Sequence, residues 1–383
     1  MTQTELVPGL AGIPAAESSI SFINGQEGLL SYRGIRIEEL AAHSNFEEVI
    51  CLLWDGTLPT QAALDAFKER LRPHSKLHPD LERFVRALPL QGHPMEALQA
   101  SLATLGMVSP RVDLRDPVAR LDACLRTMGA VSTLIAAAER HRKGLPLVEP
   151  DPNLSIAGNF LYCLNGERPD AIKTRVLDCA LVLHAEHTMN ASTFACRVVA
   201  STETNPYTAT SAAVGALYGP LHGGANERVL VQLESIGGPE NVSAWVDKKM
   251  AAKEKVMGFG HRVYKTKDPR AKNLQILARE LFEIHGSTPL YDTALRLEEE
   301  VTARLGGKGI YPNVDFFSGI VYQKLGIPTD VFTPIFALSR MAGWLAHWME
   351  QMEDNKLFRP GQIYTGRKDV SYVPIGQRSA AGK

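Results

Sequence analysis

The segment Thr288-Pro-Leu-Tyr-Asp-Thr-Ala-Leu-Arg-Leu-Glu-Glu-Glu-Val-Thr-Ala-Arg-Leu-Gly-Gly307 is typical of an amphipathic α-helix. Its apolar residues recur every three or four positions, as they do along the buried face of a helix. Thr288 suits the N-cap and Pro289 suits the first helical position, while the glycine pair at 306–307 predicts the end of the helix. We therefore expect a helix from Pro289 to Leu305 with one face in a core.

The same spacing recurs along most of the chain. The other segments that show it, each bounded by proline or glycine, are Pro59–Leu71, Pro94–Val108, Pro117–Lys143, Pro169–Ser201, Ala225–Ile236, Pro269–Ile284 and Thr333–Met352. Ser19–Tyr32 instead carries short alternating apolar runs around Asn24-Gly25, which predicts a β-hairpin and is the only clear strand signal. The sequence contains no internal repeat of about 20–50 residues, which argues against a solenoid. The sequence predicts an all-α protein with a short N-terminal hairpin.

Composition narrows the class of protein. The 383 residues are 45% hydrophobic and 22% charged, which is typical of a globular protein and excludes a disordered or collagen-like chain. The formal net charge of −1 argues against general binding to nucleic acid or to an anionic membrane. Five cysteines without C-x-x-C spacing fit a reducing compartment. We find neither a signal peptide nor 18 consecutive apolar residues, so we expect a cytoplasmic protein.

Three polar side chains are candidates for proton transfer. His222 and His261 lie in glycine-rich segments, where a side chain can be directed at a ligand, although a single histidine is often structural. Asp315 follows a proline and is flanked by bulky apolar residues. These neighbours would desolvate the carboxylate and make it a stronger base, as proton abstraction from carbon requires. The alternative is that Asp315 caps a helix.

Two further patterns suggest ligands. His184 and His187 are three residues apart, so they share a helix face and could converge on a metal, but no cysteine or carboxylate motif completes such a site. Residues 253–272 contain seven Lys and Arg against two acidic residues, an excess of five. This run is either a solvated helix face or the binding site of a phosphate-bearing cofactor beside Gly258 and Gly260. No phosphate-binding P-loop or dinucleotide fingerprint occurs.

Taken in order, seven segments of the C-terminal half resemble the citrate synthase family. They are His184-Ala-Glu-His-Thr-Met-Asn-Ala-Ser-Thr193, Gly219-Pro-Leu-His-Gly-Gly-Ala-Asn226, Gly258-Phe-Gly-His-Arg-Val-Tyr-Lys265, Asp268-Pro-Arg270, Pro312-Asn-Val-Asp-Phe-Phe-Ser-Gly319, Ser339-Arg340 and Arg359-Pro360. Near the N-terminus, Gly9-Leu-Ala-Gly12 and Tyr32-Arg-Gly-Ile35 are similar to family features as well. The resemblance thus covers most of the chain.

The resemblance implies an architecture. The family fold is all-α, with a large domain and a small domain that closes over the substrates, and it acts as a homodimer or a larger assembly. By matching position, residues 1–222 and 320–383 would form the large domain, with the oxaloacetate site and the dimer contact. Residues 223–319 would form the small domain, which binds CoA. We expect a homodimer.

The resemblance also implies a reaction, the Claisen condensation of acetyl-CoA with oxaloacetate followed by hydrolysis of the thioester to citrate and CoA, at the start of the tricarboxylic acid cycle. Asp315 matches the base, His222 the group that stabilises the enol, and His261 the acid that polarises the ketone. The residues that match the oxaloacetate ligands are His187, Arg270, Arg340 and Arg359, the last supplied by the partner subunit. The residues that match acetyl-CoA contacts are Phe336, Lys265, Lys308, Gly258 and Gly260. The family implies neither a metal nor a cofactor besides the two substrates.

Three alternatives stay open at this point. A 2-methylcitrate synthase uses propionyl-CoA with the same catalytic residues, and one methylene changes binding by only about 1–3 kcal/mol. A metal-dependent hydrolase could be built on His184 and His187. A helical scaffold without activity could keep the fold, although it would be expected to lack His222, His261 or Asp315, and all three are present.

Overall fold

The computed structural model describes residues 6–260, 264 and 268–378. The chain divides into one unit spanning Ser18–Leu357 and a second unit made of its two ends, Met1–Glu17 and Phe358–Lys383. The first unit contains the whole of the segment 223–319 that we expect to be a small domain. The boundary between the two expected domains stays a prediction.

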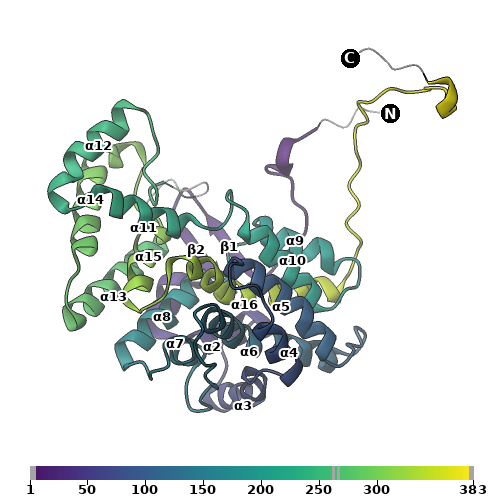
Figure 1. The fold of residues 1–383 in the computed structure, drawn as a ribbon, viewed down its shortest axis with the longest axis horizontal. Helices are drawn as coiled ribbons and strands as arrows, with labels where there is room; N and C mark the ends of the chain where they lie inside the picture. Colours follow the sequence, from purple (N-terminus) through teal and green to yellow (C-terminus); the bar gives the residue numbers. More distant parts are fainter. Residues whose placement is uncertain (1–5, 261–263, 265–267, 379–383) are drawn as a thin grey trace. The chain divides into compact units, whose positions relative to one another are not determined.

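The predicted all-α class is confirmed, since the described residues form sixteen α-helices and one small sheet (Figure 1). The first eight helices are α1 (Ile37–His43), α2 (Phe46–Asp55), α3 (Gln61–Leu71), α4 (Pro79–Arg86), α5 (Pro94–Val108), α6 (Pro117–Arg142), α7 (Ile156–Asn165) and α8 (Ala171–His184). The others are α9 (Ala191–Ala200), α10 (Pro206–Tyr218), α11 (Ala225–Ile236), α12 (Val242–Ala251), α13 (Pro269–His285), α14 (Pro289–Leu305), α15 (Val314–Lys324) and α16 (Phe332–Glu353).

The N-terminal hairpin is confirmed, but its turn differs from the expected one. Strands β1 (Ser21–Asn24) and β2 (Leu29–Tyr32) pair antiparallel, with Ser21 opposite Tyr32. The Asn24 side chain accepts hydrogen bonds from the backbone of the turn, and the residue with positive φ is Gly28, at 64°. A third strand, β3 (Ile35–Arg36), carries no signal of its own and forms only because it continues the sheet beside β2.

One long segment predicted as helical is in fact two helices. The segment Pro169–Ser201 breaks after His184, and α9 begins again at Ala191. Asn190 caps the new helix, since its Oδ1 accepts a hydrogen bond from the backbone of Thr193 at 3.1 Å. We call residues 185–190 the His187 connection, because it carries that histidine outside regular helix.

Helix α16 is the centre of the first unit. It packs against α2, α5, α6, α8, α9 and α10, and both of its tryptophans, Trp344 and Trp348, are fully buried. Helices α11 to α15 lie together on one side of this unit (Figure 1). Helices α11, α12, α14 and α15 pack mainly within this group, whereas α13 packs both on α15 and on α8 and α1. The end of α8 meets α16, where Arg340 bonds the carbonyl of His184. The beginnings of α13 and α15 are joined to each other by Asp268.

The sequence has no run of 18 consecutive apolar residues, yet among the described residues the helix α6 is long and apolar enough to cross a membrane. In the structure 78% of the most apolar 18-residue stretch of α6 is buried. It contacts α5, α7 and α16. Its apolar character is thus accounted for by packing, as in the core helix of a folded protein.

Candidate functional site

Asp315 lies at the second position of α15 and does not cap it. The N-cap is Asn313, whose side chain accepts a hydrogen bond from the backbone N–H of Asp315 at 3.0 Å. The capping alternative is therefore wrong. Burial raises the pKa of Asp315 to about 6, and the nearby Asp268 adds to this, while Arg270 and Arg340 oppose it. A carboxylate of this kind is ionised at neutral pH and more basic than an exposed aspartate.

Asp268 joins the beginnings of two helices. Its Oδ1 accepts from Nε of Arg270 at 3.0 Å and its Oδ2 accepts from an Nη of the same residue at 2.9 Å. Its Oδ2 also lies 3.3 Å from the backbone N–H of Val314, the first residue of α15. Asp268 and Arg270 are both nearly fully buried. This bidentate ion pair fixes Arg270 beside Asp315.

Arg340 comes from the buried middle of α16 and is 1% exposed. Its Nε donates to the carbonyl of His184 at 2.8 Å, and its guanidinium carbon lies 4.8 Å from the centre of the Phe336 ring. Burial lowers its pKa. Within the described residues no carboxylate forms an ion pair with it. A buried guanidinium without such a partner is suited to a substrate carboxylate.

His222 lies between α10 and α11 and is held by Ser192 at the start of α9. The backbone N–H of Ser192 points at its Nε2 at 3.3 Å, so Nε2 is an acceptor and the ring proton is on Nδ1. The Ser192 hydroxyl lies 2.8 Å from the same nitrogen. Burial, together with the charge of Arg340, lowers the pKa of His222 to about 4. The imidazole is therefore a neutral donor at physiological pH.

His184 and His187 have different surroundings. Nδ1 of His184 donates to the carbonyl of Ala180 at 2.7 Å, its ring packs edge-on against Phe336 at 5.2 Å, and burial lowers its pKa to about 3. His187 is partly exposed, and its Nε2 lies 3.4 Å from the hydroxyl of Tyr264. Among the described residues, no group of three His, Cys, Asp or Glu is placed to hold a metal.

The residues expected to contact CoA are only partly described. Gly258 and Gly260 have positive φ, and Asn313 binds both, with its N–H on the carbonyl of Gly258 and its side chain on that of Gly260, each at 2.9 Å. A Cβ on Gly258 would lie 2.8 Å from Phe316, so only glycine fits there. Lys308 is exposed.

Three predicted residues are not placed at the site by the structure. His261 and Lys265 lie outside the described residues. Arg359 belongs to the second unit of the chain, and its role stays a prediction.

The structure gives roles to three residues that the sequence analysis quoted only as parts of longer segments. Asp268 binds Arg270, Ser192 sets the tautomer of His222, and Tyr264 lies between His187 and Arg270. The first could have been found from the Asp-Pro-Arg pattern, because aspartate before proline is typical of a helix N-cap. The other two depend on which elements meet in space.

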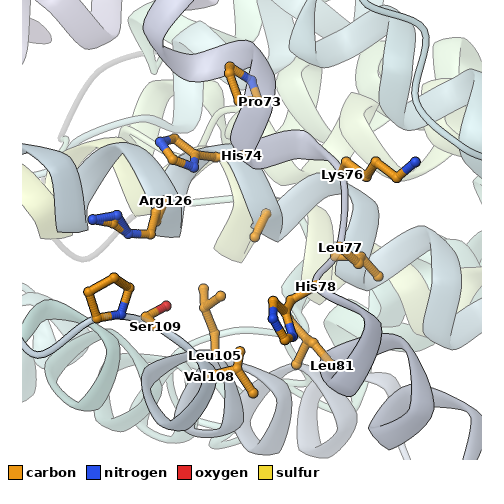
Figure 2. A pocket seen from close by; sticks show the side chains of 12 residues that line it. Pro73, His74, Lys76, Leu77, His78, Leu81, Leu105, Val108, Ser109 and Arg126 are labelled. Carbon is orange, nitrogen blue, oxygen red and sulfur yellow. The ribbon is translucent and has the colours of Figure 1, made fainter.

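A cavity of about 240 Å³ lies elsewhere, between the turn 72–75 and helices α4, α5 and α6 (Figure 2). Its lining includes the polar side chains of His74, Lys76, His78 and Arg126 and the apolar side chains of Leu105 and Val108. Burial and the charge of Arg126 lower the pKa of His74. None of the predicted site residues lines this cavity, so it is separate from the group described above.

Comparison with known proteins identifies the family. The model of the citrate synthase C-terminal domain matches residues 9–361. The chain belongs to the citrate synthase family. A citrate synthase from Synechocystis is 52% identical over 379 residues, which cover 99% of this chain and 96% of that protein.

Solved structures agree with the assignment to the citrate synthase family. Citrate synthase from Pyrobaculum aerophilum has a TM-score of 0.92 and 39% identity, and the match covers 97% of this chain and 95% of that one. Citrate synthase from Thermoplasma acidophilum, solved as a ternary complex with carboxymethyl coenzyme A and oxaloacetate, has a TM-score of 0.89 and 34% identity, covering 98% of this chain and 100% of that one. Membership of this family argues against the alternative of a metal-dependent hydrolase built on His184 and His187.

The raised pKa of Asp315 predicts a pH-dependent effect on stability. The folded value of about 6 exceeds the unfolded value of 3.8, so ionisation above pH 6 costs folding free energy, and this cost is absent below pH 3.8. Asp315→Asn should therefore raise the free energy of unfolding at pH 8 by about 1–3 kcal/mol. At pH 4 the two proteins should be nearly equal. Calorimetric melting at both pH values measures the difference, and an equal effect at both would contradict the assigned pKa.

Proposed function

We propose that this site condenses acetyl-CoA with oxaloacetate and then hydrolyses the citryl thioester to citrate and CoA. The observation that carries the proposal is the desolvated, basic carboxylate of Asp315 beside two buried arginines, Arg270 and Arg340, and a neutral His222. A carbon acid needs a strong base, and a dianionic substrate needs fixed cations. The described residues supply both.

In the first step, the carboxylate of Asp315 takes a proton from the methyl group of acetyl-CoA. Negative charge then develops on the thioester oxygen. A neutral imidazole with its proton on Nδ1 can donate to that oxygen, and His222 has this form because Ser192 occupies Nε2. A neutral donor also matches the weak acidity of an enol better than a charged one.

In the second step, the enol carbon attacks the ketone carbon of oxaloacetate, and the ketone oxygen gains a proton. We assign that proton to His261 by its position in the family motif. Oxaloacetate would be held by His187, Arg270, Arg340 and Arg359. Since Asp268 occupies one edge of the Arg270 guanidinium, a substrate carboxylate would meet the opposite edge. Water then cleaves the thioester, which releases citrate and the CoA thiol, and no further cofactor is required.

The remaining predicted residues are assigned to the binding of the acetyl group and CoA. Phe336 lies between His184 and Arg340, so it can form an apolar wall beside the reacting carbon. Gly258 and Gly260 would let the backbone approach CoA closely, while Lys265 and Lys308 would pair with its phosphates. In this proposal residues 223–319 close over the site as the small domain, and the protein acts in the cytoplasm.

Thiol release tests the reaction and its acyl preference. Purified protein is given oxaloacetate with either acetyl-CoA or propionyl-CoA, and kcat/KM is compared. We expect a clear preference for acetyl-CoA. A preference for propionyl-CoA would make the protein a 2-methylcitrate synthase with the same mechanism, and no thiol release with either substrate would support the scaffold alternative.

The proposed homodimer with a shared Arg359 can be tested by complementation. Asp315→Asn and Arg359→Ala should each be inactive as homodimers. In the heterodimer, the subunit that keeps Asp315 would receive Arg359 from its partner, so one of its two sites is intact and about half of the wild-type activity returns. Co-expression with two affinity tags allows the heterodimer to be purified. If Arg359 served its own subunit, both sites would stay defective and no activity would return.

A further inference from the structure

The His187 connection is held in a strained conformation. Thr188 has a φ of 52°, and a β-branched residue rarely adopts this left-handed region. Such strain persists only where the surrounding structure fixes the backbone firmly. The contacts of this short segment therefore show what holds His187 in place.

The N-terminal hairpin supplies the first set of contacts. The hydroxyl of Ser21 in β1 donates to Oε1 of Glu186 at 3.0 Å and accepts from the backbone N–H of Thr188 at 3.2 Å. The hydroxyl of Tyr32 in β2 lies 3.0 Å from the carbonyl and 3.2 Å from the N–H of Glu186. The residues on both sides of His187 are thus bound to the hairpin.

Helix α16 supplies the second set. Nε2 of His347 lies 3.1 Å from Oε1 of Glu186, and its Nδ1 lies 2.9 Å from the guanidinium of Arg197. Because arginine can only donate, Nδ1 of His347 accepts, and the ring proton is on Nε2, where it is donated to Glu186. Arg197 also pairs with Glu350 at 2.6 Å.

Glu186 is fully buried and ionised. Burial would raise its pKa, but His347, Arg340 and Ser21 together lower it below the ordinary value. The opposite side of the carboxylate faces α16 at Gly343. A Cβ on Gly343 would lie 2.2 Å from Oε2 of Glu186 and 2.5 Å from the carbonyl of Ala185, so the connection packs directly on the backbone of the helix.

We propose that Glu186 is a positioning residue, which together with Ser21 and His347 holds the His187 connection so that His187 can bind oxaloacetate. This group, which we call the Glu186 clamp, need not touch the substrate. The inference rests on the proposed role of His187 as an oxaloacetate ligand. It assigns the N-terminal hairpin a function in substrate affinity.

Two variants loosen or displace the clamp by different means. Ser21→Ala removes the hydrogen bonds to Glu186 and Thr188 with little change in volume. Gly343→Ala places a methyl group against Glu186 and Ala185. Each should raise the KM and the calorimetric Kd for oxaloacetate by about tenfold, since a hydrogen bond to a charged group is lost or displaced. The KM for acetyl-CoA should stay within twofold and kcat should change less than the oxaloacetate KM.

The matched control is Ser19→Ala, two residues before β1. The Ser19 hydroxyl bonds Arg33 and Glu350 but not the His187 connection. This variant should leave both KM values unchanged. If it weakens oxaloacetate binding as much as Ser21→Ala does, or if the clamp variants lower only the melting temperature, the proposal is overturned.

His187→Asn separates the clamp from the proposed role of His187. If this variant keeps full affinity for oxaloacetate, the proposed role fails and the clamp proposal fails with it. If it loses affinity while Ser21→Ala and Gly343→Ala do not, only the clamp proposal fails. Adding Ser21→Ala to His187→Asn should cause little further loss, because both act through one side chain. Fully additive losses would contradict the clamp.

Discussion

The ion pair between Asp268 and Arg270 is the interaction on which the site depends. It is buried, and the Asp268 carboxylate also approaches the first backbone N–H of α15. One carboxylate thereby aligns the beginnings of α13 and α15 and places Asp315 beside Arg270. Removal of either partner would leave an uncompensated buried charge, which typically costs about 3–5 kcal/mol. The placement of the base is thus coupled to the packing of two helices.

Burial gives each charged group a chemical property that it would lack in water. The same desolvation makes Asp315 a stronger base and keeps His222 neutral, while it leaves Arg340 in need of a negative partner. A substrate carboxylate on Arg340 would offset one of the cations that lower the pKa of Asp315. By this argument, binding of oxaloacetate makes the base stronger before the second substrate reacts. Because ionised Asp315 lowers the folding stability, Asp315→Asn is expected to have a higher free energy of unfolding.

The sequence was informative where signals are local. Proline, glycine and cap residues predicted the bounds of α5, α11 and α14 correctly, and glycine-rich motifs pointed to His222. Short-range signals failed at the break between α8 and α9, because apolar residues continue on both sides of the His187 connection. They also could not separate Asn313 from Asp315 as the cap, since both residue types suit that position.

The partners of the site residues could not be predicted, because they come from distant parts of the chain. Ser192 is 30 residues from His222, and His347 is 161 residues from Glu186. Nothing in the spacing of these residues indicates that they meet. Their pairing follows from the packing of α8 and α9 against α16.

Burial makes Asp315 a base with a pKa near 6, and direct titration of this carboxyl group is the most decisive measurement. Infrared difference spectra of the wild type against Asp315→Asn, with ¹³C-labelled aspartate, would follow this one carboxyl group from pH 3 to pH 8. The account predicts a midpoint at about 6. A midpoint at the ordinary aspartate value of 3.8 would contradict this pKa.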